Sequence, residues 1–173
     1  MSISSDTLSS QGKAAFDHKK YTQAAELFEQ AAQAYDHAGD ALMAAEMQNN
    51  RSVALLQAGK PGDALEAVTG TDKVFEQAKD TKRQAMAFGN QGAALEELKR
   101  YEEALKAYEK SSELFGEVGE TEMRSMIMQS AATIKFRQGK VLDSAFSMMG
   151  SVESTQRPTL WQRILRFFMR FIK

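Results

Sequence analysis

Apolar residues recur along residues 5–152 at the three- and four-residue spacing of an amphipathic helix, and the pattern returns every 40 residues. Two columns of small residues stand out when the chain is written in rows of 40: Gly12, Ser52, Gly92 and Ala132, then Ala24, Ala64, Ala104 and Ser144. Two columns of mostly large residues accompany them: Phe28, Val68, Tyr108 and Met148, then Tyr35, Phe75 and Phe115. The pattern therefore predicts three full repeats and a shortened fourth.

The helical spacing breaks twice in each repeat, which predicts two antiparallel helices of about four to five turns per repeat. The first kind of break has short turns at Lys19-Lys20, Gly59-Lys60, Lys99-Arg100 and Gly139-Lys140. The second kind lies at Ala38-Gly39-Asp40, Ala78-Lys79-Asp80 and Val118-Gly119-Glu120. Asp40 and Asp80 suit the N-cap position, because a carboxylate accepts the free backbone donors of a new helix.

The columns also predict how the helices pack. The small residues of the first and second helix are expected to face each other, so that the two helices approach closely. The large column that contains Phe28 and Tyr108 is expected to fill the gap to the next repeat. One helix pair cannot bury its own apolar face, so the repeats should stack into a solenoid.

The segment from Gly92 to Ser111, through Tyr101, Ala104 and Tyr108, resembles the tetratricopeptide repeat signature of small residue, aromatic, alanine and aromatic. Residues 12–31 resemble it nearly as well, whereas the second repeat departs from it with Ser52, Pro61 and Val68. The period of 40 exceeds the usual 34 or so and is similar to that of kinesin light chains and spindle-orientation adaptors. The resemblance implies an all-α, right-handed superhelical solenoid whose first helices line a concave peptide-binding groove.

Two parts of the chain are expected on this basis. Residues 5–153 should form the repeat domain, with units of about 5–44, 45–84, 85–124 and 125–153. Residues 154–173 should form a linker and a C-terminal basic amphipathic helix.

The groove face of the first helices can be identified from positions spaced i, i+3, i+4, i+7 and i+11, which lie on one side of a helix. The candidate groove residues are Glu46, Asn49, Asn50, Val53, Met86, Asn90, Ala93, Glu97, Met126, Gln129, Thr133 and Arg137. Asn50 and Asn90 share a column, and an amide can pair with the backbone of an extended peptide. Met86 and Met126 would add adaptable apolar contact. The alternative is that these side chains are merely solvated or keep the helices in register.

Charge limits the choice of ligand. Some tetratricopeptide repeat proteins clamp a C-terminal carboxylate with several basic groove residues, but Arg137 alone is basic among these candidates. A strongly acidic peptide is therefore not expected. Residues 1–155 hold 17 Lys and Arg against 23 Asp and Glu, whereas residues 156–173 hold five basic residues and no acidic one.

The C-terminal segment is apolar over more than half of its helical circumference, with the basic residues gathered in one arc. Its candidate contact residues are Trp161, Arg163, Ile164, Leu165, Arg166, Phe167, Phe168, Arg170, Phe171, Ile172 and Lys173. Four interpretations stay open: a cap on the solenoid, self-association into a homo-oligomer, binding to an anionic membrane surface, or occupation of the protein's own groove. It is too short to span a bilayer as a helix.

Catalytic chemistry is not predicted. The chain has no cysteine, and its two histidines, His18 and His37, have no metal-ligand spacing. Gly89 and Gly92 lie within a helical pattern rather than in a phosphate-binding loop. We expect no enzyme, cofactor, metal site or nucleic-acid partner.

The expected function is that of a cytoplasmic scaffold or adaptor that binds a protein or peptide in the groove, with a possible tether to a membrane. The N-terminus lacks the basic region and apolar run of a secretory signal. The alternative is a peripheral membrane or self-assembling protein whose C-terminal helix is the main functional element.

Overall fold

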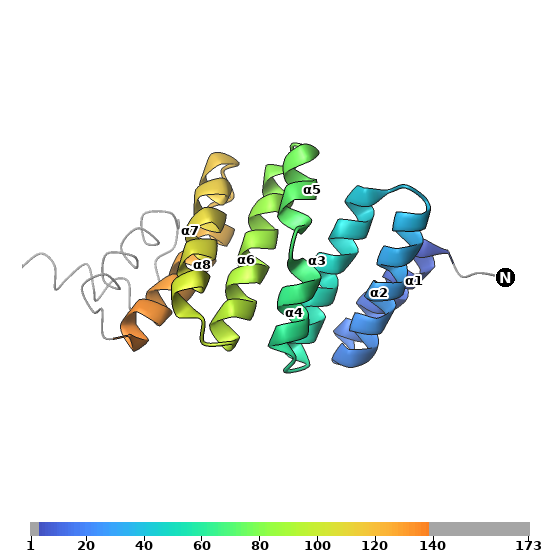
Figure 1. Cartoon of the computed structure of the whole chain (residues 1–173), viewed down its shortest axis with the longest axis horizontal. Coiled ribbons are helices and arrows are strands. Elements are labelled where there is room, and N and C mark those ends of the chain that lie inside the picture. The colour runs from blue at the N-terminus through green and yellow to red at the C-terminus, as the bar shows by residue number, and fades with distance from the viewer. Residues whose placement is uncertain (1–3, 139–173) are drawn as a thin grey trace, which may run out of the picture.

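The computed structural model describes residues 4–138, which form helices and, within that range, no strand. The helices are α1 (Ser5–Asp17), α2 (Tyr21–His37), α3 (Ala41–Gln57), α4 (Pro61–Val68), α5 (Thr71–Gln77), α6 (Thr81–Glu97), α7 (Tyr101–Glu117) and α8 (Thr121–Arg137). They lie side by side in a row from α1 at one end to α8 at the other (Figure 1). The prediction of an all-α fold is confirmed.

Consecutive helices pack as pairs, and each pair packs on the next one. α1 packs on α2, α6 packs on α7, and α3 packs on the two shorter helices α4 and α5. Between pairs, α2 contacts α3, both α4 and α5 contact α6, and α7 contacts α8. The described residues therefore form a solenoid of packed helices that runs from α1 to α8.

The turns lie at the predicted breaks. Lys19, Lys79 and Lys99 adopt the left-handed conformation, with φ of 59°, 56° and 59°. In the first of these turns, the Lys20 amide donates to the Ala15 carbonyl at 2.9 Å, as in the Schellman motif that closes many helices. The two predicted N-caps are confirmed: Asp40 accepts from the Met43 amide at 3.0 Å, and Asp80 accepts from the Arg83 amide at 2.9 Å.

The large column meets both the next repeat and its own pair. Phe28 belongs to one core cluster with Met47 of α3, and Tyr108 belongs to another with Ile134 of α8. A Cβ atom placed on Gly12 would lie 2.9 Å from the ring of Phe28, and one on Gly92 would lie 2.6 Å from the ring of Tyr108. Each aromatic ring thus also lies on the glycine of its own pair, a contact that was not predicted. The missing side chain lets the ring come this close, so the two columns act together within each pair.

Alanines and a second aromatic column form the interior. Ala24, Ala64 and Ala104 are fully buried, which allows close helix packing. Phe75 and Phe115, of the column that begins with Tyr35, are also buried, at 0% and 1% exposed. The solenoid core therefore follows the columns predicted from the sequence.

The second pair departs from the prediction of two long helices. Its second helix is broken between α4 and α5, where Gly70 adopts a φ of 87°. The break does not change the length of the repeat, because α6 begins at Thr81, 40 residues after the start of α3 at Ala41.

Several predictions fall outside the described residues: the turn at Gly139-Lys140, the end of the fourth unit, and the whole C-terminal segment 154–173. Within residues 4–138, no helix is long and apolar enough to cross a membrane.

Candidate functional site

The candidate groove residues lie on α3, α6 and α8, the first helices of successive pairs. Six of them are exposed: Met86, Glu97, Met126, Gln129, Thr133 and Arg137. Five more are half-buried: Glu46, Asn50, Val53, Asn90 and Ala93. These eleven side chains therefore have surface that a ligand could contact.

Asn49 is placed differently. Its side chain is only 5% exposed, and its Oδ1 atom has no hydrogen-bond partner among the described residues. The equivalent position one repeat later, Gly89, is also buried. Asn49 therefore belongs to the packing between repeats in this structure, and its side chain offers a ligand almost no surface.

A pocket of about 230 Å³ lies between α1 and α3 and includes three of the predicted groove residues, Glu46, Asn50 and Val53. We call it the groove pocket. Its other lining residues come from α1, α2 and α3: Ser9, Lys13, Phe16, Phe28, Met43 and Met47. Aromatic rings, methionines and a valine form most of its wall, and polar groups stand among them, which is the usual composition of a ligand site.

The contribution of α1 to this pocket was not predicted from the sequence. The signal was available, because the 40-residue register places Lys13 in the column of Val53 and Ser9 in the column of Asn49. Phe16 also contacts Tyr21, with ring centroids 5.3 Å apart, which fixes this edge of the pocket. The first repeat therefore supplies part of the candidate site.

Ion pairs within the protein compensate much of the charge on this face. The Arg83 guanidinium lies 2.7 Å from a Glu46 carboxylate oxygen and 2.9 Å from an Asp80 oxygen, so it joins α3 to α6. Arg137 lies 3.5 Å from the Glu96 carboxylate, across α6 and α8. Lys13 makes no ion pair within residues 4–138. Shape and amide groups, more than net charge, therefore distinguish this face.

Two asparagines are left unpaired. Asn50 and Asn90 are half-buried, and neither amide makes a hydrogen bond within the described part of the chain. An asparagine amide offers two donor hydrogens and an acceptor oxygen. Both side chains are therefore free to bind the backbone of a ligand.

Buried tyrosines hold the helices beneath this face. The Tyr108 hydroxyl donates to a Glu96 carboxylate oxygen at 2.9 Å, and burial and the charge of Glu96 raise the pKa of Tyr108. The Tyr35 hydroxyl donates to Asp6 at 2.5 Å, and this hydrogen bond together with burial raises the pKa of Tyr35. Glu96 thus links α6 to both α7 and α8, which keeps the first helices in register.

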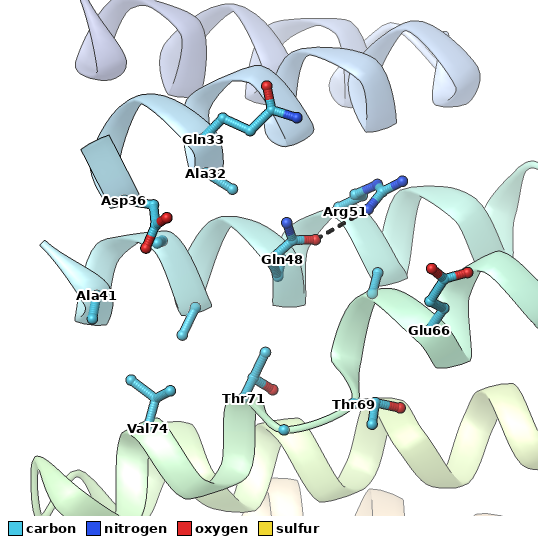
Figure 2. Close-up of a pocket in the computed structure, with 14 residues that line it drawn as sticks. Ala32, Gln33, Asp36, Ala41, Gln48, Arg51, Glu66, Thr69, Thr71 and Val74 are labelled. Atoms are coloured by element: carbon cyan, nitrogen blue, oxygen red, sulfur yellow. Dashed lines mark hydrogen bonds between the residues drawn. The ribbon is translucent and has the colours of Figure 1, made fainter. Parts of the chain in front are cut away.

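A larger pocket, of about 520 Å³, lies where α4 meets α5, between this junction and helices α2 and α3 (Figure 2). We call it the junction pocket. It shares none of its lining residues with the groove pocket. The two pockets are therefore separate candidate sites.

The described residues contain no cluster of three or more His, Asp or Glu side chains placed to hold a metal ion.

Comparison with known proteins agrees with the repeat architecture. Residues 10–70 match the tetratricopeptide repeat family, and a search of curated proteins returned no match. The matched segment covers α2, α3 and α4 and most of α1, and the later helices continue the same arrangement. The resemblance to the kinesin light chain subclass stays a prediction. Residues 10–70 are thus similar to the tetratricopeptide repeat family, and the row of packed helix pairs is consistent with a tetratricopeptide repeat architecture over the described residues.

Proposed function

We propose that this protein is a noncatalytic scaffold that binds an extended peptide along the exposed face of α3, α6 and α8, with one peptide side chain in the groove pocket. Tetratricopeptide repeats generally mediate protein–protein interactions. The observation that carries the proposal is the groove pocket, in which residues from two repeats surround a mostly apolar space.

The peptide backbone would lie against the asparagines. Asn50 lines the pocket, and Asn90 occupies the same position one repeat later. An extended peptide has one donor and one acceptor per residue, so two spaced amides can hold its backbone without selecting its side chains. Met86 and Met126, 37% and 61% exposed, would add apolar contact that adapts to different sequences.

The groove pocket would then select one side chain. Phe16, Phe28 and Met47 give it an apolar wall, and its volume suits a single large aliphatic or aromatic residue. Because Glu46 is already paired with Arg83, a cationic peptide gains little there. We expect ligands with a bulky apolar residue and low net charge.

A peptide selected from a random library against the full chain provides the test. Replacing Asn50 and Asn90 together by alanine should weaken its binding by about tenfold, since each lost hydrogen bond costs about 1 kcal/mol or less. The matched control is Gln23→Ala with Gln30→Ala, which removes two exposed amides from α2. Equal affinities for the two double variants would refute the groove assignment.

A finer proposal concerns the C-terminal segment. We propose that residues 157–173 also tether the scaffold to an anionic membrane, because five basic residues and no acidic one accompany nine apolar residues there. Flotation of the full chain with anionic and with neutral vesicles tests this. Flotation with both, or with neither, would contradict an electrostatic tether.

A further inference from the structure

The junction pocket exists because the second helix of the second pair is broken. Residues 61–77 form α4 and α5, whereas the equivalent helices α2 and α7 run unbroken for 17 residues. Figure 2 shows the connecting residues Thr69 and Thr71 at one side of the cavity, with α3 residues such as Gln48 and Arg51 opposite. The space of about 520 Å³ therefore lies beside a break that α2 and α7 do not have.

The residues at the break do not fill the cavity. The Thr69 hydroxyl donates to the Leu65 carbonyl at 2.6 Å, and the Thr71 hydroxyl donates to the Val68 carbonyl at 2.8 Å. Gly70 between them has no side chain. Ala32, Ala45 and Ala67 are buried and line the cavity with methyl groups. The cavity thus has an apolar floor that small residues leave open.

Uncompensated charge at the rim is negative. The one basic residue of the pocket, Arg51, is paired with Glu29 and also donates to Gln48 at 3.3 Å. Asp36 on α2 and Glu66 on α4 are exposed and make no ion pair within residues 4–138. Figure 2 shows these two carboxylates at opposite sides of the cavity. An apolar floor between two free carboxylates fits a long side chain with an aliphatic stem and a cationic head, that is, arginine or lysine.

We propose that the junction pocket binds the basic segment 157–173 of the same chain. This segment holds Arg157, Arg163, Arg166, Arg170 and Lys173 without an acidic residue, whereas acidic residues are in excess in the preceding 155. Apolar residues between the cations would meet the methyl groups of the floor. The segment and the junction pocket are therefore complementary in both charge and apolar surface.

The length of the chain permits this contact. Residues 139–156 connect α8 to the segment, and 18 residues can span up to roughly 60 Å when extended. Packed helices lie about 8–10 Å apart, so the row from α8 back to α4 is on the order of 30 Å. A covalent tether also gives the segment a high effective concentration at the pocket, which favours binding within one chain.

Docking at this pocket has two consequences. The groove pocket shares no lining residue with it, so a failure of peptide binding and a failure of segment docking are measured by separate experiments. The arginines that face Asp36 and Glu66 cannot face anionic lipid at the same time. Membrane binding must therefore displace the segment from the pocket.

The absence of cysteine allows a direct proximity measurement in the full chain. One variant carries Gln33→Cys, at the pocket rim, with Gln162→Cys in the segment. The control carries Lys106→Cys with Gln162→Cys. Lys106 is exposed on α7, closer in sequence to the segment, so random encounters favour the control. We expect the Gln33 pair to form an intramolecular disulfide at least tenfold faster under mild oxidation.

Reversing the charge of the two rim carboxylates tests whether they cause the fast disulfide formation of the Gln33 pair. Adding Asp36→Lys and Glu66→Lys should lower the rate for the Gln33 pair to that of the control pair. Adding Glu76→Lys and Glu117→Lys, which change net charge equally at exposed sites outside the pocket, should leave it fast. Equal rates for the two cysteine pairs, insensitivity to the reversal, or disulfides formed only between chains would each overturn the proposal. The proposal would also be overturned if the thiol introduced by Gln162→Cys were protected from labelling only when anionic vesicles are present.

Discussion

The second and third helix pairs have the same length and the same position in the repeat, yet their second helices differ. In the third pair, Tyr108 lies on Gly92 and α7 is continuous. In the second pair, Val68 and Ser52 occupy these two positions, and the helix divides into α4 and α5. The two pairs therefore show what the repeat signature contributes to the solenoid.

The local cause of the break is the sequence Thr69-Gly70-Thr71, which stands where the third pair has Glu109-Lys110-Ser111. Glycine and threonine are weaker helix formers than glutamate and lysine. Because the threonine hydroxyls bind carbonyls near the end of α4, the break is stabilised and the pair keeps its length. The repeat tolerates a broken helix, and the break opens a pocket that a continuous helix would not have.

The largest expected effect comes from removing the aromatic ring of the third pair. Tyr108→Ala should lower the free energy of unfolding by about 3–5 kcal/mol, because it leaves a cavity above Gly92. Val68→Ala should cost clearly less, since fewer atoms are removed. Urea denaturation of both variants measures the difference. Equal losses would mean that the aromatic–glycine contact does not distinguish the pairs.

A smaller change tests the close approach itself. Gly92→Ala should destabilise the protein by about 1–3 kcal/mol, because the new methyl group would lie 2.6 Å from the Tyr108 ring. Adding Tyr108→Val should make Gly92→Ala far less costly. Ser52→Ala should be neutral or stabilising, since the buried Ser52 hydroxyl has no hydrogen-bond partner among the described residues. Additive effects of Gly92→Ala and Tyr108→Val would contradict this account.

The break in the second pair can be tested at its glycine. Gly70→Ala should cost about 1–2 kcal/mol, because φ is 87° there and the left-handed conformation disfavours a side chain. Gly62→Ala in α4 is the control, since a Cβ there meets nothing within 4 Å and alanine favours the helix by about 0.5–1 kcal/mol. A stabilising Gly70→Ala would show that the broken helix readily becomes continuous.

The smallest effect depends on pH and concerns the third pair. The pKa of Tyr108 is raised in the folded protein, so its contribution to stability is complete below the unfolded value of about 10 and is lost as the pH rises above it. Between pH 8 and pH 11, the free energy of unfolding of the Tyr108→Phe variant should therefore fall by about 1 kcal/mol less than that of the unmodified protein. Urea midpoints at both pH values measure this. Identical losses would exclude a role for Tyr108 in alkaline unfolding.

The sequence predicts most of this fold because the repeat presents the same columns several times. The turns at Lys19, Gly59 and Lys99 and the caps at Asp40 and Asp80 follow from local chemistry, and the structure confirms them. The contact of Phe28 and Tyr108 with the glycines of their own pairs was not predicted, since periodicity gives the face of a residue but not every helix that it meets. The break at Gly70 was also missed, because a single glycine within a helical pattern does not determine φ.

The candidate site could be predicted only in part. The surface access of half-buried Asn50 and exposed Met86 follows from helical periodicity, whereas burial of Asn49 depends on how the second and third pairs pack together. The 40-residue register places Lys13 in the column of Val53, whereas the contribution of Phe16 to the groove pocket depends on the distance between α1 and α3, which no single helix specifies.

A map of amide and methyl chemical shifts, recorded as a library-selected peptide is added to the full chain, locates the binding face. We predict that shifts concentrate on α1, α3, α6 and α8, including the Asn50 and Asn90 side-chain amides and the methyl groups of Met43, Met47 and Val53. Shifts confined to α2, α4 and α7 would place the ligand on the opposite helices and contradict the proposed binding face.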